Sequence, residues 1–349
     1  MRTNGAHARA SSVTMMRMSL RRFADPAPVA LTLILLAAVA GPPTMSGRVS
    51  AQARPTAPLP AQPALVPDPP HVCTSCAEWN GPRQPFKIYG NTYFVGPAGL
   101  SSLLITSPQG HILVDTGLEQ SAALIDANIR ALGFKTTDVK LILTSHGHFD
   151  HVGGVHALAR YTKAEVVGSP QTARALAIGA PTPDDPQAPP TPPPGVDYFP
   201  AFEGVRGVKD GETVRVGPLS VTAHHVPGHT PGATTWTWQS CEGSRCLNMV
   251  YADSLSTVAS DGFRFTGGNG RPNIVASFRA SITTFGALPC DIMVSTHPAA
   301  SNMDEKLKKR ASLKPGDPDP FIEPGACKAL AAASMKGLED RVKAEQGKK

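Results

Sequence analysis

Six side chains able to bind a metal ion stand at loop-like positions of this chain. Four of them fall within the stretch His146-Gly147-His148-Phe149-Asp150-His151, which follows an apolar run. Two more histidines follow in turns, His229 in Pro-Gly-His-Thr-Pro-Gly and His297 in Ser-Thr-His-Pro. Imidazole and carboxylate are common zinc ligands, and catalytic zinc sites use three protein ligands and keep one position open. Five histidines and one carboxylate therefore predict two neighbouring zinc ions with three protein ligands each.

Other interpretations of these histidines exist. The first cluster could be a solvated polar turn, or a histidine-rich tract with casual metal affinity. We favour a metal centre because suitable ligands recur downstream. His224 and His225 adjoin the third motif and are alternative ligands, but neighbouring residues of a strand point to opposite faces.

The ligands must be positioned by the segments that precede them. Strands are expected over 86–95, 101–106, 110–115, 140–144, 164–167, 214–226, 233–239, 247–251 and 291–295. Helices are expected over 119–132, from about 152, from 170, over 278–288 and over 327–343. The order suggests two similar halves, so we predict an α/β fold in which two mixed sheets pack face to face with helices outside, an αββα sandwich. The metal turn would then lie at the carboxyl end of a buried strand, where α/β sheets favour ligand sites.

The N-terminus has the pattern of an export signal. Arginines precede an apolar run over 29–40, and small residues ending in Ala51-Gln52-Ala53 follow. This arrangement predicts a cleaved secretory signal peptide over residues 1–53 and a periplasmic protein. The rival interpretation is a transmembrane anchor, but about a dozen apolar residues is short of the roughly 20 that a membrane span needs. We therefore expect no stable membrane anchor.

Two proline-rich segments flank or interrupt the expected domain. Residues 54–70 contain seven prolines, and we expect 54–72 to be an extended, unpacked arm before a domain over 73–349. Residues 181–200 contain nine prolines. A loop of this kind inside a compact domain is more often functional than a tolerated insertion, although the insertion stays possible. We nominate no residue within the loop.

The charge of the chain is concentrated in the predicted signal. The whole sequence carries a net charge of +6, of which residues 1–53 account for +5. The remainder is near neutral, so electrostatics give no argument for binding nucleic acid or a membrane surface. We expect a monomer whose partner is a small-molecule substrate.

Six cysteines, an even number in a chain predicted to be exported, favour disulfides over thiolate ligands. A Cys-x-x-Cys could instead be a redox or zinc motif, but no second pair follows at the spacing of a zinc ribbon. The expected pairs are Cys241–Cys246, Cys290–Cys327 and, by what remains, Cys73–Cys76.

Together these motifs resemble the metallo-β-lactamase superfamily. The pattern His-x-His-x-Asp-His, followed by Gly-His-Thr-Pro-Gly and Thr-His-Pro, carries that resemblance. Within the superfamily, the chain resembles class B β-lactamases of the third subclass, B3, over about residues 73–343. The further supporting stretches are Gly90-Asn-Thr-Tyr-Phe-Val-Gly96, Val114-Asp-Thr-Gly117, Tyr251-Ala-Asp-Ser-Leu-Ser256 and Cys290-Asp291 before Thr296-His-Pro298. The Ala-Asp-Ser-Leu-Ser stretch and a histidine at the second site point to the subclass.

The resemblance implies a role for each ligand. It assigns His146, His148 and His229 to the first zinc ion. It assigns Asp150, His151 and His297 to the second. Ser254 and Ser256 would bind substrate near the second zinc, with Ser256 meeting the substrate carboxylate, and Asp115 would hydrogen-bond the metal loop, as partners of ligating histidines commonly do. The resemblance also implies that residues 93–95 and the proline-rich loop form pocket walls.

The implied reaction is hydrolysis of the β-lactam amide of penicillins, cephalosporins and carbapenems, which would confer antibiotic resistance. Hydroxide held between the zinc ions would attack the carbonyl, with no acyl-enzyme, and His148, Asp150 and His229 would be the catalytic residues. One alternative is an exported hydrolase of the same fold acting on a lactone or thioester. Asp253 separates the two, because an aspartate that bridges both metals would favour the alternative. A catalytically inactive zinc-binding protein is an alternative of a different class.

Overall fold

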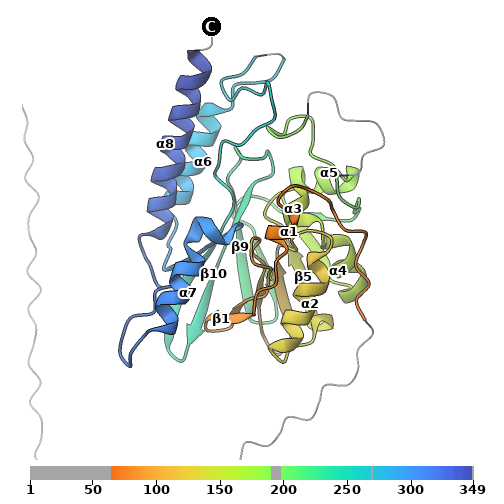
Figure 1. The fold of residues 1–349 in the computed structure, drawn as a ribbon, viewed down its shortest axis with the longest axis vertical. Helices are drawn as coiled ribbons and strands as arrows, with labels where there is room; N and C mark the ends of the chain where they lie inside the picture. The colour runs from red at the N-terminus through yellow and green to blue at the C-terminus, as the bar shows by residue number, and fades with distance from the viewer. Residues whose placement is uncertain (1–63, 190–197, 269, 348–349) are drawn as a thin grey trace, which may run out of the picture. The chain divides into compact units, whose positions relative to one another are not determined.

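The computed structural model describes residues 64–189, 198–268 and 270–347 of the chain (Figure 1). The predicted signal peptide, the first part of the proline-rich arm and residues 190–197 of the proline-rich loop lie outside the described residues. Among the helices described, none has the length and apolar composition that crossing a bilayer requires.

The first half of the domain builds a seven-stranded mixed sheet whose spatial order follows the chain. Strands β1 to β4 pair antiparallel, and β4 to β7 pair parallel. The strands are β1 (Phe86–Tyr89), β2 (Thr92–Phe94), β3 (Leu103–Ile105), β4 (His111–Val114), β5 (Val139–Leu143), β6 (Glu165–Gly168) and β7 (Arg206–Gly207).

The second half builds a five-stranded sheet in the order β12-β11-β10-β9-β8. Its pairs are antiparallel except for β11 and β12, which run parallel. The strands are β8 (Thr213–Val216), β9 (Leu219–His225), β10 (Thr234–Glu242), β11 (Arg245–Ala252) and β12 (Ile292–Ser295).

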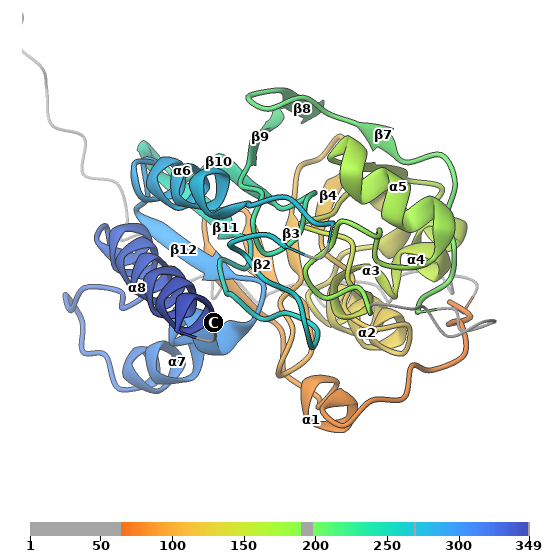
Figure 2. The same cartoon turned by 90° about the horizontal axis from the view of Figure 1, so that it is seen from above.

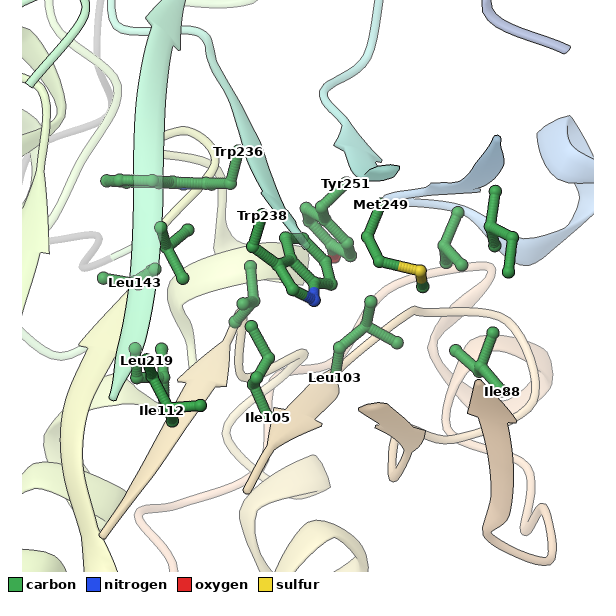
Figure 3. Packing of buried hydrophobic residues seen from close by; sticks show 14 of the residues in the cluster. Ile88, Leu103, Ile105, Ile112, Leu143, Leu219, Trp236, Trp238, Met249 and Tyr251 are labelled. Atoms are coloured by element: carbon green, nitrogen blue, oxygen red, sulfur yellow. The ribbon is translucent and has the colours of Figure 1, made fainter. Parts of the chain in front are cut away.

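The two sheets pack face to face over the main hydrophobic core. Leu103 and Leu143 of the first sheet and Trp236, Met249 and Tyr251 of the second belong to one buried cluster, and Figure 3 shows these side chains between the sheets. The alternation of inward and outward residues along each strand supplies this face. The indole Nε1 of Trp236 also donates to the Thr144 carbonyl at 3.1 Å, which ties the second sheet to the end of β5.

Helices cover the outer face of each sheet, as Figure 2 shows. The helices are α1 (Cys76–Trp79), α2 (Ser121–Ala131), α3 (Phe149–Val152), α4 (Val155–Thr162), α5 (Pro170–Ile178), α6 (Val275–Gly286), α7 (Met303–Ala311) and α8 (Ala326–Gln346), with 3-10 turns at Thr136–Asp138 and Pro298–Ser301. Apolar residues of α2, α4 and α5 pack on the first sheet, and those of α6 and α8 pack on the second. The predicted αββα sandwich is confirmed.

Two expected strands are hairpins in the structure. The run 86–95 divides at Gly90, whose φ is +54°, and the run 214–226 divides at Gly217, whose φ is +52°. Glycine adopts these left-handed values without steric cost. Continuous β-type sequences hid both turns, and the short elements α1, β7 and α7 were not predicted, because few apolar residues mark them.

The described part of the proline-rich arm is extended but packed against the domain. The Asp68 carboxylate lies 3.0 Å from His156 Nδ1 and 3.1 Å from Arg160 Nη1. The ring of His71 stacks on Phe149, with centroids 4.2 Å apart. The expectation of an unpacked arm is therefore wrong for residues 64–72, because ion pairs, a ring contact and Leu65, which packs against the apolar cluster on the first sheet, hold this segment.

All three expected disulfides are present, and no described cysteine is free. Their Cα atoms lie 5.0, 4.0 and 6.2 Å apart in Cys73–Cys76, Cys241–Cys246 and Cys290–Cys327 respectively. The last pair joins the segment before β12 to the start of α8.

Candidate metal centre

Loops after the strands of both sheets meet at one end of the sandwich. His146 follows β5, His229 follows β9 and His297 follows β12. The Thr234 amide at the start of β10 donates to the Ser145 carbonyl at 2.9 Å. The metal loop is thus bonded to the second sheet, and ligands that are distant in sequence converge at one place.

Two glycines in the His229 turn are required by close packing. A Cβ atom at Gly228 would lie 2.0 Å from the ring of Phe278, a residue of α6. One at Gly232 would lie 2.7 Å from the Thr172 amide, at the start of α5. Since real Cβ contacts are longer, only glycine lets this turn sit between the two helices.

Among the described residues, two groups of side chains have the geometry of metal-binding triads. The first triad is His146, His148 and His229, all buried, and the second is Asp150, His151 and His297, of which only His297 is partly exposed. Within each triad the potential ligand atoms lie within 4.8 Å of one another. The predicted division of the six ligands between two sites matches this grouping, and the structure forms a dinuclear metal-binding centre.

Two rings of the first triad, those of His146 and His229, are bonded to residues that follow β11. His146 Nδ1 lies 2.6 Å from Asp253 Oδ1, and its Nε2 is buried with no partner among the described residues. His229 Nδ1 lies 3.1 Å from the hydroxyl of Ser256. A buried polar atom without a partner is costly, so the bare Nε2 of His146 fits a metal ligand.

His148 is contacted from the proline-rich loop. Its Nε2 lies 3.2 and 3.1 Å from the two carboxylate oxygens of Asp185. The side-chain amide nitrogen of Gln187 lies 3.5 Å from His148 Nδ1 and 3.3 Å from His229 Nε2. Gln187 therefore lies next to the nitrogens that remain for a metal ion.

The second triad is organised around one carboxylate. Asp150 Oδ2 lies 3.3 Å from Nε2 of both His151 and His297. On the opposite side of its ring, His151 Nδ1 lies 3.4 Å from Asp115 Oδ2. The two triads lie close together: the ring centroids of His146, in the first triad, and His151, in the second, are 4.3 Å apart.

Burial keeps two histidines of the first triad, His146 and His229, in their neutral, ligating form. It lowers the pKa of His229 to about 3, helped by the neighbouring His148. Burial also holds the pKa of His146 well below its usual value, and nearby histidines add to the effect. Both imidazoles are therefore neutral at physiological pH, which metal ligation requires.

The second triad has the opposite electrostatics. Burial would raise the pKa of Asp150, but His151 and His297 outweigh it and hold this pKa well below the usual value. Burial would lower the pKa of His151, but Asp150 and Asp115 raise it to about 10. A metal ion binding here would displace the proton on His151, so binding is coupled to proton release.

Asp115 supports the metal loop, as the resemblance implied. It has a φ of +55°, rare for a residue other than glycine, and is fully buried. Its oxygens accept from the Ser145 amide at 2.7 Å, the Ser145 hydroxyl at 2.6 Å and the Tyr251 hydroxyl at 2.9 Å. The carboxylate therefore fixes the chain one residue before His146.

The two predicted substrate-binding serines adjoin different triads. The Ser254 hydroxyl lies 2.9 Å from that of Thr296, the neighbour of His297. Ser256 is exposed and contacts His229 of the first triad. Both were expected near the second zinc; Ser254 adjoins that triad, Ser256 contacts the neighbouring first triad, and their binding roles stay predictions.

Other candidates lie outside both triads. Asp253 belongs to neither triad: its Oδ1 lies 2.6 Å from His146 Nδ1, and its Oδ2 is buried without a hydrogen-bond partner among the described residues. His224, on β9, bonds to Thr237 Oγ1 of β10 at 2.8 Å. Neither His224 nor His225, the other alternative ligand, belongs to a triad. Residues 93–95 do not form the expected pocket wall, because the ring of Tyr93 packs on Phe134 and both Phe94 and Val95 are fully buried.

Three contacting residues were not identified from the sequence. Asp185 and Gln187 lie in the proline-rich loop, where nothing in the local pattern marks them. The ring of Trp79 has its centroid 5.4 Å from that of His297 and 6.3 Å from that of Phe149. Trp79 follows the first disulfide. An aromatic residue next to a small disulfide loop was the one sequence signal that could have placed Trp79 near the metal centre.

Comparison with known proteins identifies the class that this fold and site define. Residues 95–241 match the model of the metallo-β-lactamase superfamily. The Rm3 metallo-β-lactamase structure is 49% identical, with 79% of this chain and 100% of that chain covered and a TM-score of 0.74. The chain belongs to the metallo-β-lactamase superfamily.

Other relatives define its place within the superfamily. MEM-A1, a subclass B3 metallo-β-lactamase isolated from a soil metagenome library, is 44% identical over 78% of this chain and 100% of that chain, with a TM-score of 0.72. The hydroxyacylglutathione hydrolase GloC of Haemophilus influenzae is 29% identical over 33% of this chain and 54% of that protein. The chain thus spans about half the length of this curated relative, whereas it matches subclass B3 structures from end to end.

Proposed function

We propose that this protein is a zinc-dependent β-lactamase of the B3 type that hydrolyses the amide bond of penicillins, cephalosporins and carbapenems. One observation carries the proposal: two complete triads lie side by side while Asp253 is held behind His146 instead of between them. The B3 relatives support the substrate class, because they match the whole domain at up to 49% identity.

The residues fit two zinc ions, and each has a definite task. His146, His148 and His229 would hold one ion. Asp150, His151 and His297 would hold the other. Zinc at these positions would supply an activated water at neutral pH and polarise the carbonyl.

The chain's own groups complete the reaction. Asp115 and Asp253 orient the rings of His151 and His146 from behind. The exposed hydroxyl of Ser256 is available to a substrate carboxylate. No serine nucleophile is needed on this route, so Ser254 and Ser256 bind instead of forming an acyl-enzyme.

The geometry of Asp253 argues against the lactone or thioester alternative. A bridging aspartate must direct an oxygen at both metal positions. Here Oδ1 lies 2.6 Å from His146 Nδ1, and it also accepts from the Ser254 amide at 2.7 Å. The side chain is fully buried in this position. The match to a hydroxyacylglutathione hydrolase is therefore a likeness of fold and metal motif.

The proposal is tested by hydrolysis of a chromogenic cephalosporin and a carbapenem by purified mature protein. We expect turnover of both, loss with a chelator and recovery on adding zinc. The catalytically inactive alternative predicts zinc binding without turnover. Protein that binds two zinc ions and hydrolyses no β-lactam would refute the proposed function.

A histidine pair offers a matched control. His229→Ala removes a first-triad ligand and should lower kcat/KM by at least 1,000-fold, on the order of removing a central catalytic group. His224→Ala removes a histidine of the preceding strand whose side chain bonds to Thr237 and belongs to neither triad. This variant should keep wild-type turnover, which separates loss of a ligand from a general effect on the strand.

We also propose that the chain acts as a monomer in the periplasm. Disulfides persist in oxidising compartments, and this domain contains three. Cell fractionation of a host expressing the full chain should find a processed form in the periplasm. Size-exclusion chromatography with light scattering should give the mass of one chain.

A further inference from the structure

The described part of the proline-rich loop lies against the first triad. Asp185 contacts His148, and Gln187 lies next to His148 and His229. The loop is held by a second loop, since Ser260 Oγ donates to the Ala188 carbonyl at 2.9 Å and Arg271 Nη1 donates to the Asp185 carbonyl at 3.2 Å. These contacts single out two residues in a loop for which the sequence nominated none.

Asp185 is buried and directed at one imidazole nitrogen. Its exposed fraction is 3%. The Gln187 amide donates to its Oδ1 at 2.7 Å, and its own amide donates to the Thr182 carbonyl at 2.8 Å. The carboxylate is therefore fixed before any ligand binds, with both oxygens within 3.2 Å of His148 Nε2.

We propose that Asp185 is a positioning residue for the first metal ion, acting through His148. An ionised carboxylate can accept hydrogen bonds but cannot donate them, so His148 must carry its proton on Nε2, the nitrogen that faces Asp185. The lone pair then lies on Nδ1, the nitrogen that Gln187 approaches beside His229 Nε2. The inference deepens the proposed function and assumes only that the first triad binds zinc.

The three rings of the triad show why His148 depends on this contact. His146 and His229 are held by partners in the segment that follows β11, Asp253 and Ser256. His148 receives its partner from the proline-rich loop instead. Without Asp185 its ring could rotate or change tautomer, because its other neighbour, Gln187, is 3.5 Å away. Loss of such partners typically weakens metal affinity about 10- to 100-fold.

The loop does not depend on the Asp185 carboxylate for its attachment. The bonds from Ser260 and Arg271 end on backbone carbonyls of the loop. A substitution at Asp185 leaves these acceptors in place. Metal affinity and folding can therefore be measured as separate effects of the same variant.

The experiment measures zinc affinity by competition with a chromophoric chelator. An Asp150→Asn background removes the central carboxylate of the second triad and isolates the first. In it, Asp185→Ala should weaken zinc binding about 10- to 100-fold. Asp185→Asn should lose a smaller factor, about 3- to 10-fold, because the amide oxygen still accepts from Nε2 without charge. The visible spectrum of the cobalt-substituted protein should change in both variants.

Asp184→Asn is the matched control. Asp184 is the preceding residue, its side chain is 52% exposed, and its ion pair with Arg174 is 3.7 Å long. It should bind zinc as the parent does. Thermal unfolding of each apo-protein reports whether a substitution disturbs folding instead of the site.

The possible outcomes separate the two proposals. Wild-type zinc affinity in Asp185→Ala would overturn the positioning role. If Asp185→Ala lowers the thermal unfolding midpoint of the apo-protein, the isosteric variant Asp185→Asn provides the test. Parental stability together with parental zinc affinity in Asp185→Asn would also overturn the positioning role. Absence of β-lactam turnover in wild-type protein would refute the proposed function and leave the affinity comparison unaffected.

Discussion

Glu119 is a buried carboxylate that should make the protein less stable as the pH rises. It is 2% exposed, its Oε2 has no hydrogen-bond partner among the described residues, and Oε1 lies 3.8 Å from His71 Nδ1. Burial raises its pKa to about 7, and Asp68 adds to the rise. We predict that Glu119→Gln removes a pH-dependent loss of stability.

The sign follows from which state binds the proton more tightly. The unfolded chain loses the Glu119 proton near pH 4.5 and the folded chain near pH 7. The stabilising effect of the raised pKa is full below pH 4.5 and is lost as the pH rises through 7. Each unit of pKa shift corresponds to about 1.4 kcal/mol, so the full loss is about 3 kcal/mol. Between pH 5 and pH 8 the expected part is about 2.5 kcal/mol.

The assay is urea denaturation of the apo-protein at pH 5 and pH 8. Relative to wild type, Glu119→Gln should gain about 2.5 kcal/mol of unfolding free energy on going from pH 5 to pH 8. Glu78→Gln alters an exposed glutamate on α1 and should show no such gain. An equal difference between wild type and Glu119→Gln at both pH values would refute the reasoning.

Three further predictions concern the metal centre and the domain. Asp150→Asn should lower zinc content from two ions to about one per chain by elemental analysis, and unchanged content would disprove the second-site assignment. Ser256→Ala should raise KM for a carbapenem about 10-fold with little change in kcat, as loss of a binding contact does; an unchanged KM would exclude Ser256 from binding. Replacing Cys290 and Cys327 by serine opens a loop spanning 37 residues and should lower unfolding free energy by about 4 kcal/mol; urea denaturation matching wild type would contradict this.

The sequence predicted the metal ligands because their positions depend on local rules. The stretch from His146 to His151 follows a short apolar strand, and the turns around His229 and His297 each follow another strand. Strand ends that share one edge of a sandwich bring their loops together. Residue type, turn residues and strand order were therefore enough to find the six ligands, and the resemblance to the superfamily divided them into two triads.

The contacts that support the site were predicted less completely. Asp115 was recognised because it ends a strand beside the metal loop. Asp185 was not, because its partner His148 is 37 residues away and the proline-rich sequence between gives no periodic pattern. The docking of Asp68 on α4 was missed for a similar reason, since ion pairs between distant segments leave no local signal.

The carboxylates around the centre also explain why one chemistry is favoured over another. Asp253, Asp185 and Asp115 each lie behind a different histidine ligand, and Asp150 alone belongs to a triad. A carboxylate that accepts from the outer nitrogen of an imidazole cannot also reach the metal positions on the other side of the ring. Asp253 is thereby removed from the bridging role that the lactone or thioester alternative requires. With three protein ligands in each triad, a metal ion bound there would keep an open position for water, which direct hydrolysis of an amide needs.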